Sequence, residues 1–280
     1  MTELFRILTY RTFEPTEISG LQVWLNNETL GADGSSVSQW DDSSGNNFHF
    51  TQPNASYRPT VYSDSGSKTI RLLENSFLTC LVDLSLLRNV SGGTTFIVHK
   101  QLMSSYSPTL IISSGLNSYD ARLNTFVSVN KYVSQMRVID SDTVKNAISN
   151  QTIDQTKYWI QSTAADFENN DLYQYINSNL DGTNINTGGS YSSSTDSVAI
   201  FLGANLLSPA YEQYPSSSLF PKPIDLARVQ IKEVLIFNRI LTALEKFNIE
   251  RYLSIKHNIN LTKLVPSTSL FPSSTTFIPW

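Results

Sequence analysis

Residues 228–259 decide the fold, and they read RVQIKEVLIFNRILTALEKFNIERYLSIKHNI. Between Val229 and Phe237 apolar residues occupy both odd and even positions, which is typical of a strand covered on both of its faces. Simple alternation predicts that the odd-numbered residues share one face and the even-numbered ones the other. The first set is Val229, Ile231, Glu233, Leu235 and Phe237, and the second includes Val234 and Ile236.

After Asn238 and Arg239 the spacing of the apolar residues becomes that of a helix. Thr242-Ala-Leu-Glu245 is a capping box, in which the hydroxyl and the carboxylate can bond the first free N–H groups of a helix. At 100° per residue the sequence predicts an amphipathic helix that must lie on another element. Its expected apolar arc is Leu241, Leu244, Ile249, Tyr252, Leu253 and Ile255, and its expected polar arc is Lys246, Glu250, Arg251 and Ser254.

This block resembles the closing strand and terminal helix of the concanavalin A-like lectin/glucanase superfamily, most closely its laminin-G-like branch. The resemblance lies in Ile231–Arg239, Leu241–Glu245 and Tyr252–Lys256. It implies an all-β fold, an antiparallel jelly-roll β-sandwich with a short C-terminal amphipathic helix at its rim. Glu233 matches a position that the family associates with the fold.

A second resemblance lies at the other end of the chain. Gly20-Leu-Gln-Val-Trp24-Leu25, Trp40-Asp-Asp-Ser-Ser-Gly-Asn46 and Arg58-Pro59 follow the order of the laminin-G-like opening. Matches at both ends predict one domain over residues 19–261, whose two ends meet in the same sheet. Residues 1–18 then form an N-terminal docking arm, and residues 262–280 form a tail rich in Pro, Ser and Thr.

Composition narrows the possible partners. The 280 residues are enough for one sandwich with extensions, and Lys plus Arg number 20 against 24 Asp plus Glu, which gives a net charge of −4. Without a basic run, nucleic acid is not an expected partner. The sequence has no run long and apolar enough for a membrane span and no secretory signal pattern, so we expect synthesis in a cytoplasm.

Cysteine and histidine do not indicate a metal site. Cys80 is the single cysteine, which excludes an intrachain disulfide. His49, His99 and His257 are far apart and lack ligand spacing, so each is expected to be structural.

The segment Asp42-Ser-Ser-Gly-Asn46 permits two interpretations. Asp and Asn side chains bond nearby backbone and Gly supplies positive φ, so it predicts a turn between strands. The oxygen atoms of Asp41, Asp42, Asn46 and Asn47 could instead hold Ca²⁺, as in related lectin-like domains. The turn is the favoured interpretation, and Ca²⁺ is the one cofactor that the sequence suggests.

The middle of the chain contains short apolar runs separated by turn residues, which is the pattern of a sandwich and not of a βαβ repeat. The expected strands are 69–73, 77–81, 94–99, 109–113, 122–129, 133–138, 158–162, 172–176, 197–202 and 229–237. Leu172–Asn177 with Asp181-Gly182 resembles a family hairpin in which Asn and Gly are adjacent, although here inserted residues separate them.

Two further regions could contact a partner. Residues 206–223 form a proline-containing loop with Tyr211, Tyr214 and Phe220, which either pack on the sandwich or bind a ligand. Both extensions carry apolar residues that favour docking onto another subunit: Leu4, Phe5, Ile7, Leu8, Phe271, Phe277, Ile278 and Trp280. The N-terminal arm could equally complete the domain's own sheet.

Catalytic signatures are missing from the sequence. Glycanases of this superfamily carry carboxylates at alternating positions of one strand, and no E-x-D-x-x-E pattern occurs. The nearest acidic pairs, Asp140 with Asp142 and Asp166 with Glu168, fit loop or hairpin ends. A serine elbow, a phosphate loop and a zinc helix are also lacking.

The resemblance therefore favours a non-enzymatic structural or adhesive protein of a phage virion, such as a tail-fibre, baseplate or capsid decoration component. Its expected partners are other virion subunits, through the arm and tail, and host-surface glycan, and we expect an oligomer or assembly component. Two alternatives stay open: a decoration protein that binds no sugar, and a glycanase of the same superfamily. Fold alone does not choose among them.

Overall fold

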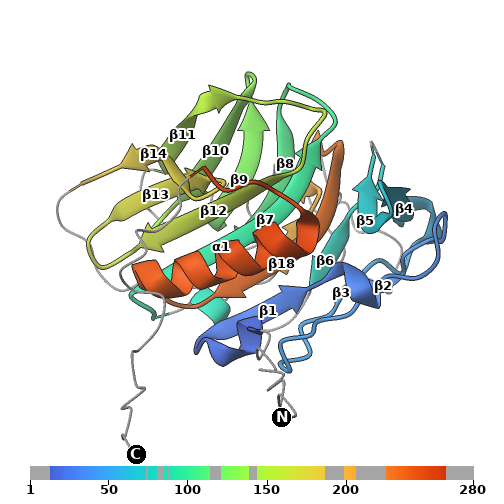
Figure 1. Cartoon of the computed structure of the whole chain (residues 1–280), viewed down its shortest axis with the longest axis horizontal. Helices are drawn as coiled ribbons and strands as arrows, with labels where there is room; N and C mark the ends of the chain where they lie inside the picture. Colours follow the sequence, from blue (N-terminus) through green and yellow to red (C-terminus); the bar gives the residue numbers. More distant parts are fainter. Residues whose placement is uncertain are drawn as a thin grey trace, which may run out of the picture.

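Two antiparallel sheets pack face to face, and one helix lies on the outer face of the first sheet (Figure 1). The computed structural model describes residues 13–73, 75–80, 85–87, 89–113, 121–138, 144–186, 199–205 and 225–262. All paired strands in this part of the chain run antiparallel, so the predicted fold class, an antiparallel β-sandwich with a short C-terminal helix, is confirmed.

The first sheet is built around β18, which pairs with β7, β5 and β1. Its strands, in spatial order, are β14 (Asn179–Asn184), β13 (Asp171–Ile176), β12 (Trp159–Asp166), β7 (Gly92–Gln101), β18 (Val229–Phe237), β5 (Ser67–Leu72) and β4 (Thr60–Asp64), with β1 (Leu21–Leu25) beside β18. The pairing of β1 with β18 confirms that the two ends of the sandwich meet in one sheet.

The second sheet covers the inner face of the first. Its order is β11 (Lys145–Thr152), β10 (Lys131–Met136), β9 (Ala121–Ser128), β8 (Ser107–Ser113), β15 (Ala199–Leu202), β6 (Leu78–Cys80), β3 (Phe50–Thr51) and β2 (Gln39–Trp40). A separate two-stranded sheet pairs β16 (Ala204–Asn205) with β17 (Asp225–Leu226). The described residues also form short 3-10 helices, which are η1 (Pro15–Glu17), η2 (Asn27–Thr29), η3 (Ala55–Tyr57) and η4 (Ser85–Leu87).

Strand β18 contains a bulge between Ile231 and Glu233, where the register with β7 shifts by one residue. The extra residue at the bulge shifts the alternation of side chains, so that residues after the bulge point to the opposite face from the one that simple alternation predicts. The predicted faces of this strand are therefore wrong. The side chains that face the core between the sheets are Val229, Ile231, Val234 and Ile236, whereas Leu235 and Phe237 pack with the helix on the outer face. Lys232 and Glu233 consequently both point outward.

Helix α1 (Ala243–His257) begins with the predicted capping box, since Thr242 Oγ1 accepts from the Glu245 amide and the Glu245 carboxylate accepts from the Thr242 amide. It ends at Asn258, whose left-handed conformation (φ 54°) places its N–H on the Ser254 carbonyl. The helix lies across the outer face of the first sheet (Figure 1). The side chains that form this outer core include Trp24, Phe96, Ile160, Leu235, Phe237, Ile249 and Leu253.

The predicted helix faces are only partly correct. Ile249 and Leu253 are buried as expected, but Leu244 and Ile255 are 51% and 71% exposed. Glu250, expected on the polar arc, is buried. The sheet supplies polar partners that a periodicity argument does not include, because Glu250 accepts a hydrogen bond from Ser162 Oγ of β12 at 2.9 Å.

Seven strands of the described residues lie outside the predicted strand ranges and the family-like opening segment 20–25: β4, β11, β14 and the two-residue strands β2, β3, β16 and β17. In β11 the buried positions are the small residues Ala147 and Ser149, while the apolar Ile148 between them is exposed, so the strand has no apolar alternation. In the hairpin β13–β14 the turn is Asn177-Ser178, with φ values of 47° and 70°, so the hairpin does not turn at Asp181-Gly182. Gly182 lies within β14, where a Cβ would meet the Ile148 carbonyl of β11 at 2.7 Å.

Residues next to the predicted domain limits contact the sandwich. Phe13 packs edge-on against Tyr252 of α1, and Ile18 is buried in the same outer core. At the other end, Thr262 donates two hydrogen bonds to the Asn177 carbonyl. Residues 1–12 and 263–280 lie outside the described residues, and the division at 18 and 262 stays a prediction.

We predict that Leu253→Asp lowers the free energy of unfolding by on the order of 4 kcal/mol, because it places a carboxylate where no side-chain partner is available and leaves a void. Ile255→Asp is the matched control, two residues away on the exposed side of α1, and should change stability by less than about 0.5 kcal/mol. Urea denaturation of both variants measures this. Equal effects would show that α1 does not cover the sheet.

Candidate functional site

The bulge in β18 delivers a carboxylate into the interface between the first sheet and α1. Glu233 is fully buried, and its Oε1 accepts from Trp24 Nε1 at 2.7 Å and from the Tyr252 hydroxyl at 3.1 Å. Its Oε2 lies 2.6 Å from His257 Nε2 and 3.1 Å from Lys256 Nζ. One carboxylate therefore joins β1, β18 and the last turns of α1.

The ionisation of this cluster follows from its contacts. Burial alone would raise the pKa of Glu233, but the hydrogen bond from His257 and the charge of Lys256 outweigh it, so this pKa is lowered. Burial lowers the pKa of His257 more than Glu233 raises it, so the imidazole is neutral at pH 7. A neutral ring donating from Nε2 agrees with its buried Nδ1, which has no hydrogen-bond partner.

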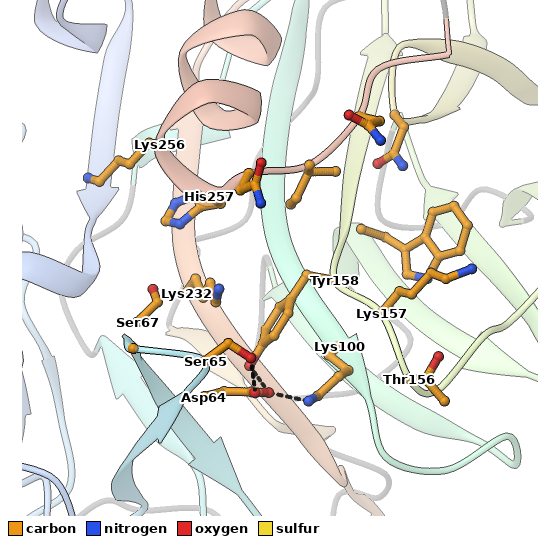
Figure 2. Close-up of a pocket in the computed structure, with 16 residues that line it drawn as sticks. Asp64, Ser65, Ser67, Lys100, Thr156, Lys157, Tyr158, Lys232, Lys256 and His257 are labelled. Atoms are coloured by element: carbon orange, nitrogen blue, oxygen red, sulfur yellow. Dashed lines mark hydrogen bonds and ion pairs between the residues drawn. The ribbon is translucent and has the colours of Figure 1, made fainter.

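Next to this cluster, the outer face of the first sheet carries an open pocket of about 620 Å³. It lies between the β4–β5 hairpin and the end of α1, above β7, β12 and β18 (Figure 2). Its polar lining comes from several separate elements and includes Asp64, Ser65, Ser67, Lys100, Thr156, Lys157, Tyr158, Asn177, Lys232, Lys256, His257, Asn258 and Asn260. Trp159 and Ile259 add apolar surface.

Asp64 and Tyr158 lie next to each other in the pocket lining. The Lys100 ammonium and the Tyr158 hydroxyl both contact Asp64 Oδ2, and the hydroxyl also donates to Gln230 Oε1 at 2.7 Å. The hydrogen bond from Lys100 is the main reason that the pKa of Asp64 lies below its usual value. Asp64 is therefore an ionised acceptor at neutral pH.

Three of the four pocket lysines have carboxylate partners. Lys100 contacts Asp64, and Lys157 Nζ lies 2.9 Å from Asp154 Oδ2 at the exposed rim. Lys256 turns away from the pocket centre (Figure 2), toward Glu233. These pairs leave one ammonium group in the described lining without a carboxylate at ion-pair distance.

That group belongs to Lys232, the residue at the bulge. The residue is only 5% exposed, and its Nζ lies 4.0 Å from the centre of the Tyr158 ring. Within the described part of the chain it makes no hydrogen bond and no ion pair. Burial lowers its pKa, although Asp64 opposes that shift.

The predicted Ca²⁺ residues gather around one turn. Asp42 accepts hydrogen bonds from the backbone amides of Trp24, Ser44 and Phe48 and from the Ser44 hydroxyl, so its oxygens already stabilise the turn. Asn46 Nδ2 donates to the carbonyls of Leu21 and Gln22. Asn47 has φ 62°, and Asp41 Oδ1 accepts from the side-chain Nε2 of Gln39.

This geometry matches the turn interpretation, while Ca²⁺ binding stays a prediction. Within the described ranges no three His, Cys, Asp or Glu side chains gather into a metal cluster. His49 lies in the same turn and accepts from the Asp42 amide at 3.1 Å. His99 is buried, and its pKa is lowered to about 3 by burial. Tyr211, Tyr214 and Phe220 lie outside the described residues.

Sequence reasoning did not identify the pocket. Its lining comes from segments as far apart as Asp64 and Asn260, and only the chain topology brings them together. One signal was available: Lys232-Glu233 interrupts an otherwise apolar central strand.

In the described residues, no helix is long and apolar enough to cross a membrane.

No known family model and no curated protein sequence matches this chain. Solved structures do. Botulinum neurotoxin type C, studied for its interaction with two ganglioside molecules, matches with a TM-score of 0.55 and 13% identity over 84% of this chain and 51% of its own. The receptor-binding domain of neurotoxin type G matches with a TM-score of 0.53 and 15% identity over 85% and 52%.

A Trypanosoma rangeli sialidase, solved with 2,3-difluorosialic acid, matches with a TM-score of 0.54 and 14% identity over 87% of this chain and 34% of the sialidase. This chain thus spans about half the length of the neurotoxin chains and a third of the enzyme. At these identities the likeness shows the fold alone, an antiparallel β-sandwich.

Glu233→Gln should lower the free energy of unfolding by roughly 3–5 kcal/mol at pH 7, because it leaves Lys256 without its buried partner and weakens the bond to His257. Glu28→Gln is the control. Glu28 also contacts Lys256, at 3.2 Å, but its side chain is 76% exposed, so its loss should cost less than about 1 kcal/mol. Chemical denaturation distinguishes them, and a Glu233→Gln variant as stable as Glu28→Gln contradicts the role of the cluster.

Proposed function

We propose that this chain is a non-enzymatic, laminin-G-like glycan-binding module of a larger assembly, with a phage virion as its setting. The observation that carries the proposal is the pocket between the β4–β5 hairpin and the end of α1. It is open, and its lining combines hydroxyl, amide and ammonium groups with the Tyr158 and Trp159 rings. Saccharides present hydroxyl groups at their edges and C–H groups on their faces, which suits this mixture.

The structural neighbours support the same class of ligand. The type C neurotoxin interacts with ganglioside molecules, and the sialidase was solved with a sialic acid derivative. Both share only the fold with this chain, so the ligand class is our inference. The assembly setting draws support from the laminin-G-like resemblance and from the apolar residues in segments 1–12 and 263–280.

The pocket chemistry favours binding over hydrolysis. Two-carboxylate glycosidases need an acid that can donate a proton and a second carboxylate about 5 Å or 6.5–9.5 Å away. Asp64 is the one carboxylate residue among the described lining residues, and its lowered pKa makes it a poor proton donor at pH 7. A glycanase of the superfamily is the alternative that an activity assay tests.

The full chain should bind a defined subset of a glycan array, and Asn260→Trp should abolish that binding by filling the pocket mouth. Asn260 is exposed and lines the pocket. Ile148→Trp is the control, since Ile148 is exposed on β11 of the other sheet. Arrays run with Ca²⁺ and with a chelator also test the Asp41–Asn47 turn as a metal site.

An array without any bound glycan favours the purely structural alternative. Released reducing ends from a polysaccharide panel favour the glycanase. Equal binding by the Asn260→Trp and Ile148→Trp variants would place the sugar site elsewhere.

A chain limited to residues 13–262 should unfold cooperatively as a monomer but fail to enter the parent particle. Its boundaries follow the contacts of Phe13 and Thr262 with the sandwich. A chain starting at residue 19 is the control and should melt at a lower temperature, because it lacks the buried Ile18. Incorporation of the 13–262 chain at the normal level would refute the assembly role of the two end segments.

A further inference from the structure

Lys232 occupies an unusual position for a cation. Its side chain is nearly enclosed and its ammonium has no acceptor among the described residues, while Lys100, Lys157 and Lys256 each have a carboxylate. Although the residue is largely covered, its ammonium opens into the pocket, and the face of the Tyr158 ring is its closest described contact. The fold maintains this arrangement through the bulge, which turns Lys232 outward beside Glu233.

We propose that Lys232 is the anion receptor of the glycan pocket, and that the ligand is an acidic saccharide whose carboxylate or sulfate group binds this ammonium. The inference rests on the proposed function and specifies its ligand. An oxyanion at Lys232 would supply the acceptor that the ammonium lacks, and charge-assisted hydrogen bonds are the strongest of their kind. Figure 2 shows Lys232 between His257 and Asp64, beside the Tyr158 ring.

The neighbouring charges permit this ligand. Asp64 and Glu233 are the nearby carboxylates, and each is already neutralised by a lysine. Two carbonyls near the end of α1 also have donors: the Ser254 carbonyl accepts from the Asn258 N–H, and the Ile259 carbonyl accepts from the Ser254 hydroxyl.

Ser67 offers a second donor from the hairpin side of the pocket. Its Oγ accepts a hydrogen bond from Asn27 Nδ2 at 3.1 Å, which leaves the hydroxyl proton free for a ligand oxygen. Lys232 and Lys100 lie over the Tyr158 ring, 4.0 and 4.9 Å from its centre, so Trp159 is the lining aromatic residue that offers a flat surface to the sugar. The anionic group and the sugar ring thus have separate places in one pocket.

The test uses the full chain and three sugars that share one core: lactose, 3′-sialyllactose and 3′-sulfolactose. Calorimetry or ligand-observed NMR should show that one or both acidic sugars bind at least roughly tenfold more tightly than lactose. Lys232→Met should remove that preference, and Lys232→Arg should retain it. Lys145→Gln removes an equal charge from β11 of the other sheet, outside the pocket, and should leave the preference intact. Melting curves establish that each variant is folded.

Each outcome is decisive. Comparison of the two acidic sugars separates a carboxylate site from a sulfate site. Equal binding of acidic and neutral sugars, or an unchanged preference in folded Lys232→Met, overturns the inference while glycan binding stands. Failure of all three sugars together with an empty glycan array overturns the proposed function as well.

Discussion

The buried carboxylate of Glu233 is the interaction on which the outer layer of this molecule depends. It accepts hydrogen bonds from Trp24 on β1 and from Tyr252 and His257 on α1, and it pairs with Lys256. An ionised group in such a place is stable only when every oxygen is satisfied. The cluster therefore fixes the position of the last turns of α1 on the sheet, and those turns form one wall of the pocket.

A single irregularity connects the fold with the proposed site. Regular alternation in β18 would point Lys232 and Glu233 to opposite faces, and one charge would enter the core between the sheets. The bulge between Ile231 and Glu233 places both on the outer face. Glu233 then holds the helix, and Lys232 remains as the unpaired cation in the pocket beside it. Stability and binding thus share one local backbone feature.

The sequence predicts the sandwich well and the site poorly, for physical reasons. Strand and helix periodicity are local, so β18 and the capping box at Thr242 could be predicted, and the resemblance at both ends of the sandwich predicted that these two ends meet. The orientation of α1 could not, because it depends on polar contacts such as that between Glu250 and Ser162, far apart in the chain. The pocket joins Asp64, Lys100 and Lys232 from three strands, and no motif describes that arrangement.

The central claim is that the bulged strand presents Lys232 as an anion receptor in a glycan pocket. A crystal structure of the full chain soaked with the acidic sugar that binds most tightly tests it most directly. The account predicts that the carboxylate or sulfate oxygen lies about 3 Å from Lys232 Nζ, with the sugar ring on Trp159. Sugar bound at another face, with Lys232 still lacking an acceptor, would contradict it.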